Sequence, residues 1–449
     1  MVEFNIMERE SRLKILIHDP YPARKNSPDG VSNYIREIIP HLEGLGCRVR
    51  LVAPFIKDRE NDIADYNLGI PRKFSLNKRN NLHVAVSFNK RRAHSLIKTV
   101  KPDLIIVHEP SVPNSAHTII SAIPKGEDGQ RMVPVIGQFH ARTEVLDRKT
   151  QILLGILQVA RRPKFRAGLP VGVTPGPLNT LREGLSGRIA ISQATADFWN
   201  KYFPGDYRVI YNGIDVEYLT SEGSRIESWQ DGKKTILFAG RHDERKGIEY
   251  LLRAYLSLRN AGVDNIKLKL TGNGKLTKML IALVKKEEIP DVEFLGVLSR
   301  EDLIKAYRSA DVFVAPSIGG EGFNRTIAEA RACGALVVCS DIEGHREAIG
   351  EDLSPFMARP LHAVSLAEKI NTILNLPQES KDEIKAKTSI DAREKFAWEK
   401  IAGENVKYYD EVLVQHGKLV RQDWTKKKKT IWSRIPILGT VFVNVRQKS

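Results

Sequence analysis

Short runs of apolar, often β-branched residues alternate along this chain with segments of helical period, and this alternation restricts the fold more than any other feature. The first runs lie at 13–17, 48–52, 104–107, 133–136 and 188–191. Between the first two, Gly30 opens a segment whose apolar residues recur at helical spacing up to Leu42. Strands that are apolar on both faces and separated by helices are typical of a parallel sheet covered on both sides.

A second series of apolar runs begins after a polar stretch at 216–233. It comprises residues 235–239, 266–270, 292–295, 312–315 and 335–339. Two domains are also what a length of 449 residues leads us to expect, because one hydrophobic core rarely serves so long a chain. We therefore predict an α/β protein with two doubly wound, Rossmann-like domains that face each other across a cleft. They would occupy residues 1–215 and 234–395, joined by a linker at 216–233.

The composition excludes several classes of protein. With 42% hydrophobic and 28% charged residues, the chain is neither disordered nor fibrous. Its three cysteines are too few and too scattered for a disulfide framework, which favours a reducing compartment. Residues 1–11 lack the pattern of a signal peptide, and no apolar run reaches the roughly 20 residues that span a bilayer. We therefore expect a cytoplasmic protein, either free or bound to the cytosolic face of a membrane. We also expect no metal site, because the sequence contains no cluster of His and Cys at metal-binding spacing.

The net charge of +16 is concentrated in three segments. Residues 72–98 contain eight Lys or Arg and no acidic residue, and the segments 145–188 and 415–449 are also strongly basic. Such clustering predicts an anionic partner, either a phospholipid surface or a nucleic acid, with solvated charge as the plain alternative. The basic segments lack interleaved aromatic residues, so we favour a membrane surface and expect no nucleic acid as a partner.

The loop after the run 235–239 carries Arg241 and Lys246 ahead of the next helical segment. In open parallel sheets, ligands bind beyond the carboxyl ends of the strands, so this loop lies where a ligand is expected. Arg can hold phosphate oxygens in a fork while Lys supplies a mobile charge. The pair therefore suits a diphosphate, unless the loop simply carries solvated charges.

The loop after the run 312–315 combines glycines with acidic residues. The glycines within 319–322 would let the backbone approach a ligand, and a helix from about Asn324 would offer N–H groups to a phosphate. Glu321 and Glu329 are eight residues apart, at the start of this helix and two turns into it. Their carboxylates could accept from the hydroxyls of a hexose and a ribose, whereas either glutamate alone would indicate only an exposed charge.

Taken in order along the chain, these and several shorter motifs resemble the retaining glycosyltransferases of family 4, which have the GT-B fold. The similarity spans about residues 12–415, and within the family it points to the bacterial phosphatidylinositol mannosyltransferases. The matching motifs lie at 28–31, 107–110, 139–140, 187–192, 211–215, 240–247, 308–311 and 321–330.

The resemblance implies a retaining hexosyltransferase, a peripheral membrane enzyme that moves mannose from GDP-mannose to a lipid acceptor such as phosphatidylinositol. Its partners would be a nucleotide sugar and an anionic phospholipid surface, and it would need neither a metal nor another cofactor. A UDP-sugar-dependent transferase acting on another lipid or glycan is the alternative. The amino-terminal domain would bind the acceptor, residues 234–395 the donor, and a final helix over 396–414 would pack back on the amino-terminal domain.

The resemblance also assigns a role to each matching residue. The catalytic residues would be His140, Arg241, Lys246 and Glu321, with the two cations neutralising the donor diphosphate. The residues that bind the donor would be Gly30, Arg241, Lys246, Gly320, Glu321, Gly322, Phe323, Asn324 and Glu329. The residues that bind the acceptor would be Tyr21, Asp29 and His140. Glu321 would accept from sugar hydroxyls and Glu329 from the nucleotide ribose.

Two residues depart from the family pattern. Asn324 stands where Gly is common, although Asn tolerates a positive φ better than most residues. Asp29 replaces a Gly and puts a carboxylate near the donor phosphates. Both differences bear on the identity of the donor and the acceptor.

Two segments favour contact with a membrane. Residues 146–162 have the period of an amphipathic helix, and Arg161, Arg162, Lys164 and Arg166 form a dense basic group at its end. An ordinary core helix is the alternative, but such a group favours insertion among anionic headgroups. In the basic, apolar tail at 415–449, the basic run 426–429 precedes apolar and aromatic residues, which indicates a second membrane contact unless the tail is disordered.

Overall fold

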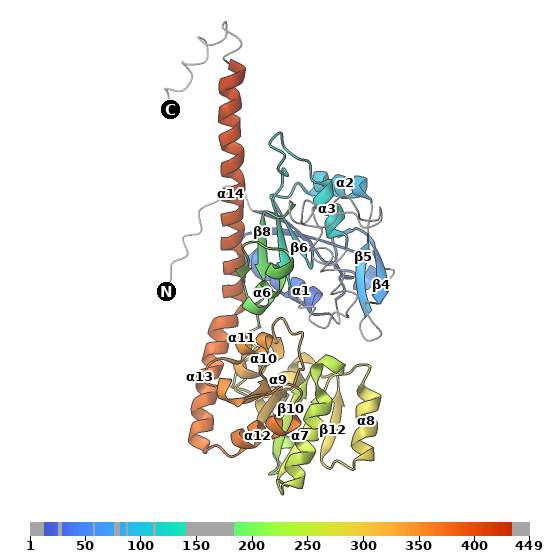
Figure 1. Cartoon of the computed structure of the whole chain (residues 1–449), viewed down its shortest axis with the longest axis vertical. Coiled ribbons are helices and arrows are strands. Elements are labelled where there is room, and N and C mark those ends of the chain that lie inside the picture. Colours follow the sequence, from blue (N-terminus) through green and yellow to red (C-terminus); the bar gives the residue numbers. More distant parts are fainter. Residues whose placement is uncertain are drawn as a thin grey trace, which may run out of the picture.

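The computed structural model describes residues 13–25, 29–56, 59–75, 81–86, 89–110, 114–140 and 184–432. These residues form two α/β domains that are stacked along the long axis of the molecule (Figure 1). Each domain contains a parallel sheet with helices on both faces, as the alternation of apolar runs predicts. The predicted fold class, two Rossmann-like domains, is confirmed.

The amino-terminal domain contains β1 (Lys14–His18), α1 (Gly30–Gly44), β2 (Arg48–Ala53), η1 (Arg59–Asn61), β3 (Tyr66–Asn67), α2 (Lys90–Val100), β6 (Leu104–His108), α3 (Ala116–Ala122), β7 (Val135–Phe139), β8 (Gly187–Ala190), α6 (Gln193–Tyr202) and β9 (Arg208–Val209). Its seven strands pair in the order β3-β2-β1-β6-β7-β8-β9, all in parallel. At the centre, Ile15 pairs with Val49 on one side and with Leu104 on the other. The strands are apolar on both faces because α1 covers one face, and α2 and α3 cover the other.

The carboxy-terminal domain contains η3 (Glu227–Trp229), β10 (Lys234–Ala239), η4 (Glu244–Lys246), α7 (Ile248–Asn260), β11 (Ile266–Thr271), α8 (Thr277–Lys286), β12 (Val292–Gly296), α9 (Arg300–Ser309), β13 (Val312–Ala315), α10 (Arg325–Ala332), β14 (Val337–Ser340), α11 (Glu343–Ile349), η5 (Ser354–Phe356), β15 (Met357–Ala358), α12 (Ala363–Leu374) and α13 (Gln378–Phe396). Its six strands pair in parallel in the order β12-β11-β10-β13-β14-β15. The linker predicted at 216–233 packs on this domain, where Leu219 and Trp229 join the hydrophobic core.

A short antiparallel hairpin, β4 (Ile70–Ser75) with β5 (Asn81–Val86), is the one piece of sheet in the described residues that stands outside the two parallel sheets. The sequence pattern does not predict it, because Pro71 and closely spaced basic residues break the apolar pattern that marks a strand. Except for its first two residues, Ile70 and Pro71, the hairpin lies within the basic segment 72–98.

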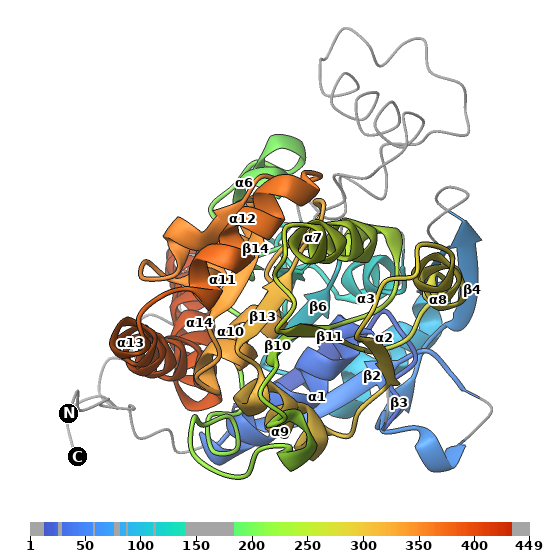
Figure 2. The same cartoon turned by 90° about the horizontal axis from the view of Figure 1, so that it is seen from below.

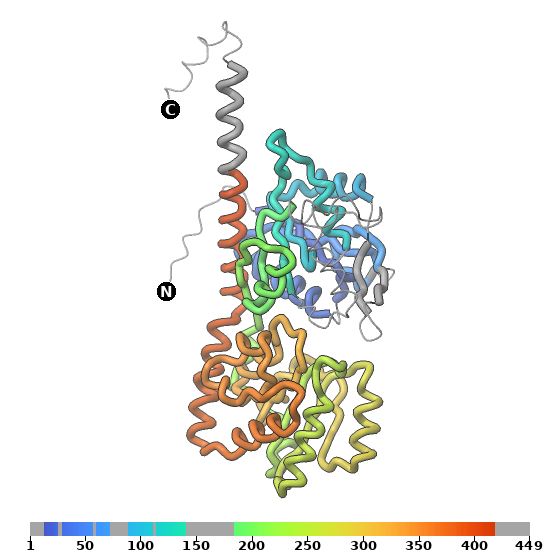
Figure 3. Tube along the Cα trace, viewed as in Figure 1, coloured from blue at the N-terminus to red at the C-terminus, as the bar shows by residue number. Residues whose placement is uncertain are grey.

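The chain passes between the two domains twice, and the two crossings contact each other (Figure 3). On the first crossing, the Ile214 N–H donates to the carbonyl of Phe396 on the second crossing, at 2.8 Å. Gly213 leaves no room for a side chain, because a Cβ there would come within 2.2 Å of the Trp398 ring. The two domains are therefore joined by two segments of chain that pack against each other where they cross.

The last helix, α14 (Trp398–Trp432), begins at this crossing and packs on the amino-terminal domain. The ring of Trp398 lies 5.4 Å from that of Tyr34 in α1, measured between centroids. Further along the same helix, the Tyr408 hydroxyl accepts a hydrogen bond from the backbone N–H of Arg188 at 3.0 Å. The helix runs on past residue 414, where the sequence suggested that the tail begins.

Strand order reverses between β1 and β6 in one sheet, and between β10 and β13 in the other. Figure 2 looks along the long axis and shows β10 and β13 in front of the amino-terminal domain. In open sheets of this kind, ligands bind beyond the carboxyl ends of the strands at the reversal. The segments that follow three of these strands, β1, β10 and β13, carry most of the residues predicted to form the site.

Candidate active site

The loops that follow β10 and β13 contact each other closely. The Ile318 N–H donates to the carbonyl of Arg245 at 2.8 Å. Gly247 has a φ of +66°, and a Cβ there would come within 2.1 Å of the Pro316 carbonyl oxygen. Only glycine meets both conditions, the left-handed backbone and the close approach. The basic loop and the glycine-rich loop therefore form one surface.

Lys246 and Glu321 form an ion pair at the centre of this surface, with 2.9 Å between Nζ and Oε1. Their side chains are 17% and 10% exposed. Burial by itself would raise the pKa of Glu321, but the charges of Lys246 and Arg245 outweigh it and lower that pKa to about 2. Glu321 is thus a carboxylate at neutral pH. The pair offers a cation for phosphate oxygens beside an anion for sugar hydroxyls.

Arg241 lies at the rim of the same loop rather than beside Lys246. Its side chain is 59% exposed, and its guanidinium is 3.2 Å from the carboxylate of Asp243. The two predicted phosphate-binding cations therefore share a loop, but they differ in environment. The Lys246 side chain is mostly buried and paired with Glu321, whereas the Arg241 side chain is mostly exposed and paired with Asp243.

Glu329 is the fifth residue of α10 and lies about one turn into it, whereas Glu321 precedes the helix. The prediction that Glu321 starts the helix and that Glu329 lies two turns further on is therefore wrong, because α10 begins only at Arg325. Its Oε1 is 2.9 Å from Nε of Arg325, and its Oε2 accepts from the Tyr307 hydroxyl at 3.3 Å. Burial, opposed by the charge of Arg325, raises the pKa of Glu329 above its usual value. The Glu329 carboxylate, which is predicted to bind the ribose, is therefore positioned by Arg325 and Tyr307.

Asn324 does not adopt the positive φ that a Gly replaced by Asn would suggest. Its φ is −97°, and it directly precedes α10. Its side-chain amide lies 2.9 Å from Nε2 of His345, and its N–H donates to the Gly344 carbonyl at 3.3 Å. The residue therefore ties the glycine-rich loop to α11.

His140 directly follows β7 and is buried in the amino-terminal domain. Its Nε2 is 2.8 Å from Nδ1 of His108, and its backbone N–H donates to Oε1 of Glu109 at 2.8 Å. Burial lowers the pKa of His140 to about 3, so the imidazole is neutral at physiological pH. His140 can orient a hydroxyl, but it carries no charge to a transition state.

The remaining acceptor-side residues surround the start of α1. Asp29 caps this helix, its Oδ1 accepting from the Ser32 N–H at 2.7 Å, which accounts for a carboxylate at a position where the family has Gly. No atom lies within 4 Å of a Cβ built on Gly30, so the space outside the helix start is open. Tyr21 is largely buried beside Asp19 and Asp29, and burial raises the pKa of its hydroxyl.

The two halves of the site meet at Gly322. A Cβ on Gly322 would come within 2.4 Å of the carbonyl oxygen of His140, and the Gly322 carbonyl accepts from the Ser192 hydroxyl at 2.6 Å. Nearby, Glu347 of α11 accepts from the first N–H groups of α6, those of Gln193 and Ala194, at 2.8 and 3.0 Å. The predicted donor loop is therefore docked against the predicted acceptor side.

Ser192, Glu347, Glu37 and Arg325 were given no role from the sequence, although all four make contacts between the domains. Ser192 and Arg325 lie within motifs shared with the family, which is a usable signal. Glu347 and Glu37 give none, because each acts through a residue more than 150 positions away that only the assembled fold brings near.

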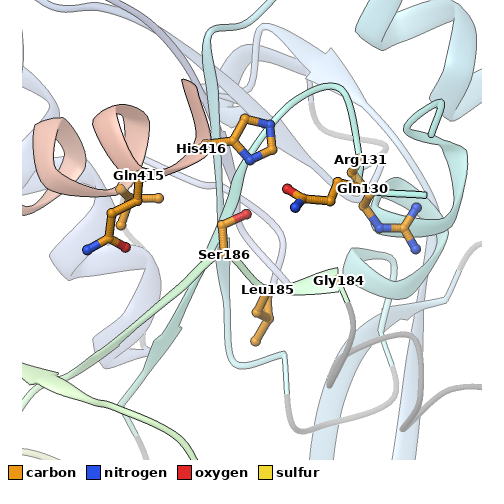
Figure 4. A pocket seen from close by; sticks show the side chains of 8 residues that line it. Gln130, Arg131, Gly184, Leu185, Ser186, Gln415 and His416 are labelled. Atoms are coloured by element: carbon orange, nitrogen blue, oxygen red, sulfur yellow. The ribbon is translucent and has the colours of Figure 1, made fainter. Parts of the chain in front are cut away.

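A pocket of about 210 Å³ lies elsewhere, where α14 passes the amino ends of β7 and β8 (Figure 4). Polar side chains that include Arg131, Ser186 and His416 line it. We do not assign the catalytic site to this pocket, because it lies at the opposite edge of the sheet from the site residues and from the strand-order reversals.

Arg161, Arg162, Lys164 and Arg166, the predicted membrane-binding residues, lie outside the described residues. Among the residues that the structure does describe, no helix is long and apolar enough to cross a membrane. In the same part of the chain, no group of three or more His, Cys, Asp or Glu side chains is arranged to hold a metal ion.

The sequence matches two families of known proteins in succession. Residues 28–218 match the family described as Glycosyltransferase Family 4, and residues 221–390 match Glycosyl transferases group 1. A phosphatidyl-myo-inositol mannosyltransferase from Mycobacterium leprae is 24% identical over 406 residues, which cover 89% of this chain and 97% of the relative.

Solved structures are similar over nearly the same length. A glycosyltransferase from Rickettsia africae has a TM-score of 0.66 at 17% identity, over 90% of this chain and 99% of its own. Anabaena Alr3699/HepE, in complex with UDP-glucose, has a TM-score of 0.65 at 19% identity, over 89% and 100%. The chain therefore belongs to the glycosyltransferases, with a family 4 domain followed by a group 1 domain in the GT-B fold. The relatives similar to it over most of its length include phosphatidyl-myo-inositol mannosyltransferases, as the sequence motifs predict.

Proposed function

We propose that this glycosyltransferase moves mannose from GDP-mannose to a lipid acceptor such as phosphatidylinositol, with retention of the anomeric configuration. The observation that carries the proposal is the Lys246–Glu321 pair, which adjoins Gly322, a residue that packs against the carbonyl of His140 in the other domain. A site with a cation, a sugar-binding carboxylate and a neutral imidazole from the opposite domain suits transfer between a nucleotide sugar and an acceptor. The similarity to phosphatidyl-myo-inositol mannosyltransferases supports mannose and an inositol lipid.

In the proposed reaction, Lys246 and Arg241 bind the donor diphosphate, and the open amino end of α1 at Gly30 contacts it from the other side. Glu321 accepts from the sugar hydroxyls. The acceptor hydroxyl attacks C1 of the sugar on the face that the nucleotide leaves. The C1–O bond to the phosphate breaks as the bond to the acceptor oxygen forms, and the acceptor proton passes to the departing phosphate. The two cations stabilise the charge that develops on that phosphate.

We also propose that the reaction needs no divalent metal, because Lys246 and Arg241 supply the positive charge that a metal would otherwise bring to the diphosphate. Transfer should persist in excess chelator. Loss of transfer on chelation, restored by magnesium or manganese, would contradict this part of the proposal.

A UDP-sugar donor is the second candidate. Anabaena Alr3699/HepE, which shares the fold, was solved with UDP-glucose, and nothing in the described loops selects guanine over uracil. A panel of GDP- and UDP-sugars, each supplied with vesicles that contain phosphatidylinositol, separates the candidates. Lys246→Met serves as the inactive control, and we expect turnover with GDP-mannose alone.

A further inference from the structure

The side chain of Arg325, the first residue of α10, lies between two carboxylates from different domains. Its terminal nitrogen is 2.6 Å from Oε2 of Glu37 in α1, and its Nε is 2.9 Å from Oε1 of Glu329. The three side chains are only 25%, 22% and 15% exposed, in the order Arg325, Glu37, Glu329. The free-energy contribution of three partly buried charges depends much more on their geometry than that of an exposed ion pair does.

Each carboxylate has a further partner that extends the chain of contacts. Tyr307 of α9 donates to Glu329 at 3.3 Å, and Nε1 of Trp398 donates to Glu37 at 3.2 Å. Trp398 is the first residue of α14, at the place where the chain crosses between the domains. The contacts therefore run without a break from the donor domain, through Arg325, to the crossing.

The charges in this arrangement do not balance, since one guanidinium serves two carboxylates. Burial raises the pKa of Glu329, the charge of Arg325 lowers it, and the charge of Glu37 raises it again. Without Arg325, two partly buried carboxylates would repel each other across the domain interface. Arg325 therefore favours the ionised form of Glu329 and also holds Glu37 of α1 beside the start of α10.

We propose that Arg325 is a positioning residue that couples the binding of a nucleotide at Glu329 to the docking of the two domains. This inference rests on the donor site proposed above, but not on the identity of the sugar or the acceptor. The guanidinium orients the Glu329 carboxylate for the ribose hydroxyls while it binds Glu37. Because coupling between two equilibria is reciprocal, domain docking strengthens nucleotide binding and a bound nucleotide strengthens docking.

The test measures binding of GDP and UDP by calorimetry to the full chain and to Glu37→Gln, Arg325→Met and the double variant. Glu37→Gln should weaken binding about five- to tenfold although Glu37 belongs to the other domain and is not itself a proposed nucleotide ligand, a loss at the low end of typical coupling. Arg325→Met should weaken it at least as much. The double variant should be no worse than Arg325→Met, since the repulsion between the carboxylates has then been removed. Glu43→Gln, exposed on the same helix, controls for the loss of a negative charge.

A second measurement distinguishes coupling from a merely structural role. The N–H groups of Gln193 and Ala194 donate to Glu347 across the interface, so their hydrogen exchange reports domain docking. Nucleotide should slow this exchange in the wild type and in Glu43→Gln, and much less in Glu37→Gln.

Nucleotide affinity and exchange in Glu37→Gln and Arg325→Met that equal the wild type would overturn the inference. Glu329→Gln tests the donor site separately, because it should lose affinity whether or not the domains are coupled. If Glu329→Gln binds nucleotide as the wild type does, or if the wild type binds neither nucleotide, the proposed donor site is wrong and the inference fails with it.

Discussion

The backbone carbonyl of His140, in the amino-terminal domain, lies directly against the α-carbon of Gly322, in the carboxy-terminal domain. A single methyl group on Gly322 would come within 2.4 Å of that oxygen and within 2.9 Å of the Thr195 hydroxyl. Both neighbours are held in place, since the backbone of His140 is bonded to Glu109, and Thr195 to Ser192. The site therefore depends on the absence of a side chain at one position of the donor loop.

Gly322→Ala should push the domains apart and reduce transfer by at least about tenfold, in line with the cost of overpacking a close contact. Each domain should remain folded, because the clash lies between the domains and not within either core. Initial rates of transfer measure the loss of activity, and circular dichroism checks that the variant is folded. Gly403→Ala in α14, where a Cβ meets no atom within 4 Å, is the matched control. Wild-type rates in Gly322→Ala would show that the docked arrangement is not the active one.

The ion pair between Lys246 and Glu321 should give the protein an acid-sensitive contribution to stability. Burial opposes ionisation, but the nearby cations lower the pKa of Glu321 from 4.5 to about 2. A carboxyl whose folded pKa is depressed stabilises the fold above its unfolded pKa and loses that contribution as the pH falls through the folded value. The contribution should thus be complete above about pH 4.5 and lost towards pH 2.

Lys246→Met leaves Glu321 buried without its partner and should cost about 3 kcal/mol at pH 7. Urea unfolding measures the free energy of unfolding, and the difference between Lys246→Met and the wild type should shrink as the pH approaches 2. Lys275→Met breaks the more exposed pair with Glu244 and should cost less than about 1 kcal/mol at any pH. A difference for Lys246→Met that does not change with pH would show that the two side chains do not interact as an ion pair.

Asp19, at the carboxyl end of β1, should affect the pH dependence of stability in the opposite direction to Glu321. Burial first, and the charge of Asp29 second, raise its pKa from 3.8 to about 8. A group with a raised folded pKa favours the fold fully below its unfolded pKa and loses that contribution as the pH rises through the folded value. Asp19→Asn should therefore be more stable than the wild type at pH 8, and the gain should vanish near pH 4. Asp206→Asn, at an exposed position, should show no such pH dependence, and an equal response of both variants would contradict the assignment.

Membrane binding should depend on charge first and on apolar contacts second. Each Lys or Arg near an anionic surface contributes roughly 1 kcal/mol within a Debye length of about 8 Å. Replacing Arg161, Arg162, Lys164 and Arg166 with Ser should weaken binding to anionic vesicles and slow transfer to lipid. Hydrolysis of the donor by water should remain unchanged.

Vesicle sedimentation at increasing salt measures this binding. Replacing Lys278, Lys285 and Lys286 on α8, in the other domain, controls for a general loss of positive charge. Equal binding of the wild type to neutral and anionic vesicles would mean that the basic segment is only a solvated surface.

Local patterns in the sequence were enough to predict the strands and loops that build the site. A continuous apolar run followed by glycine and charged residues marks both β10 with Lys246 and β13 with Glu321, because strand, turn and ligand loop are adjacent in sequence. That the two loops belong to one site followed from the general rule for parallel sheets. The direct contact between Lys246 and Glu321 did not follow, since it depends on the order of β10 and β13 within the sheet.

Contacts between the domains could not be predicted in the same way. Arg325 and Glu37 are 288 positions apart, and neither stands in a local pattern that indicates a partner. Asp29 was predicted as an acceptor-binding residue and as a carboxylate near the donor phosphates, whereas its role as the cap of α1 depends on where that helix begins. Individual charged residues can belong to a ligand site, a helix cap or an interface, and only the packed structure distinguishes these uses.

The central claim is retaining transfer of mannose from GDP-mannose to an inositol lipid, and the anomeric configuration of the first product tests it most directly. The purified protein would be incubated with GDP-α-mannose and vesicles of phosphatidylinositol, and the anomeric configuration of the glycolipid determined by NMR. We predict an α-linked mannosyl lipid, formed by the wild type and not by Lys246→Met. A β-linked product, or transfer from a UDP-sugar with none from GDP-mannose, would contradict the account.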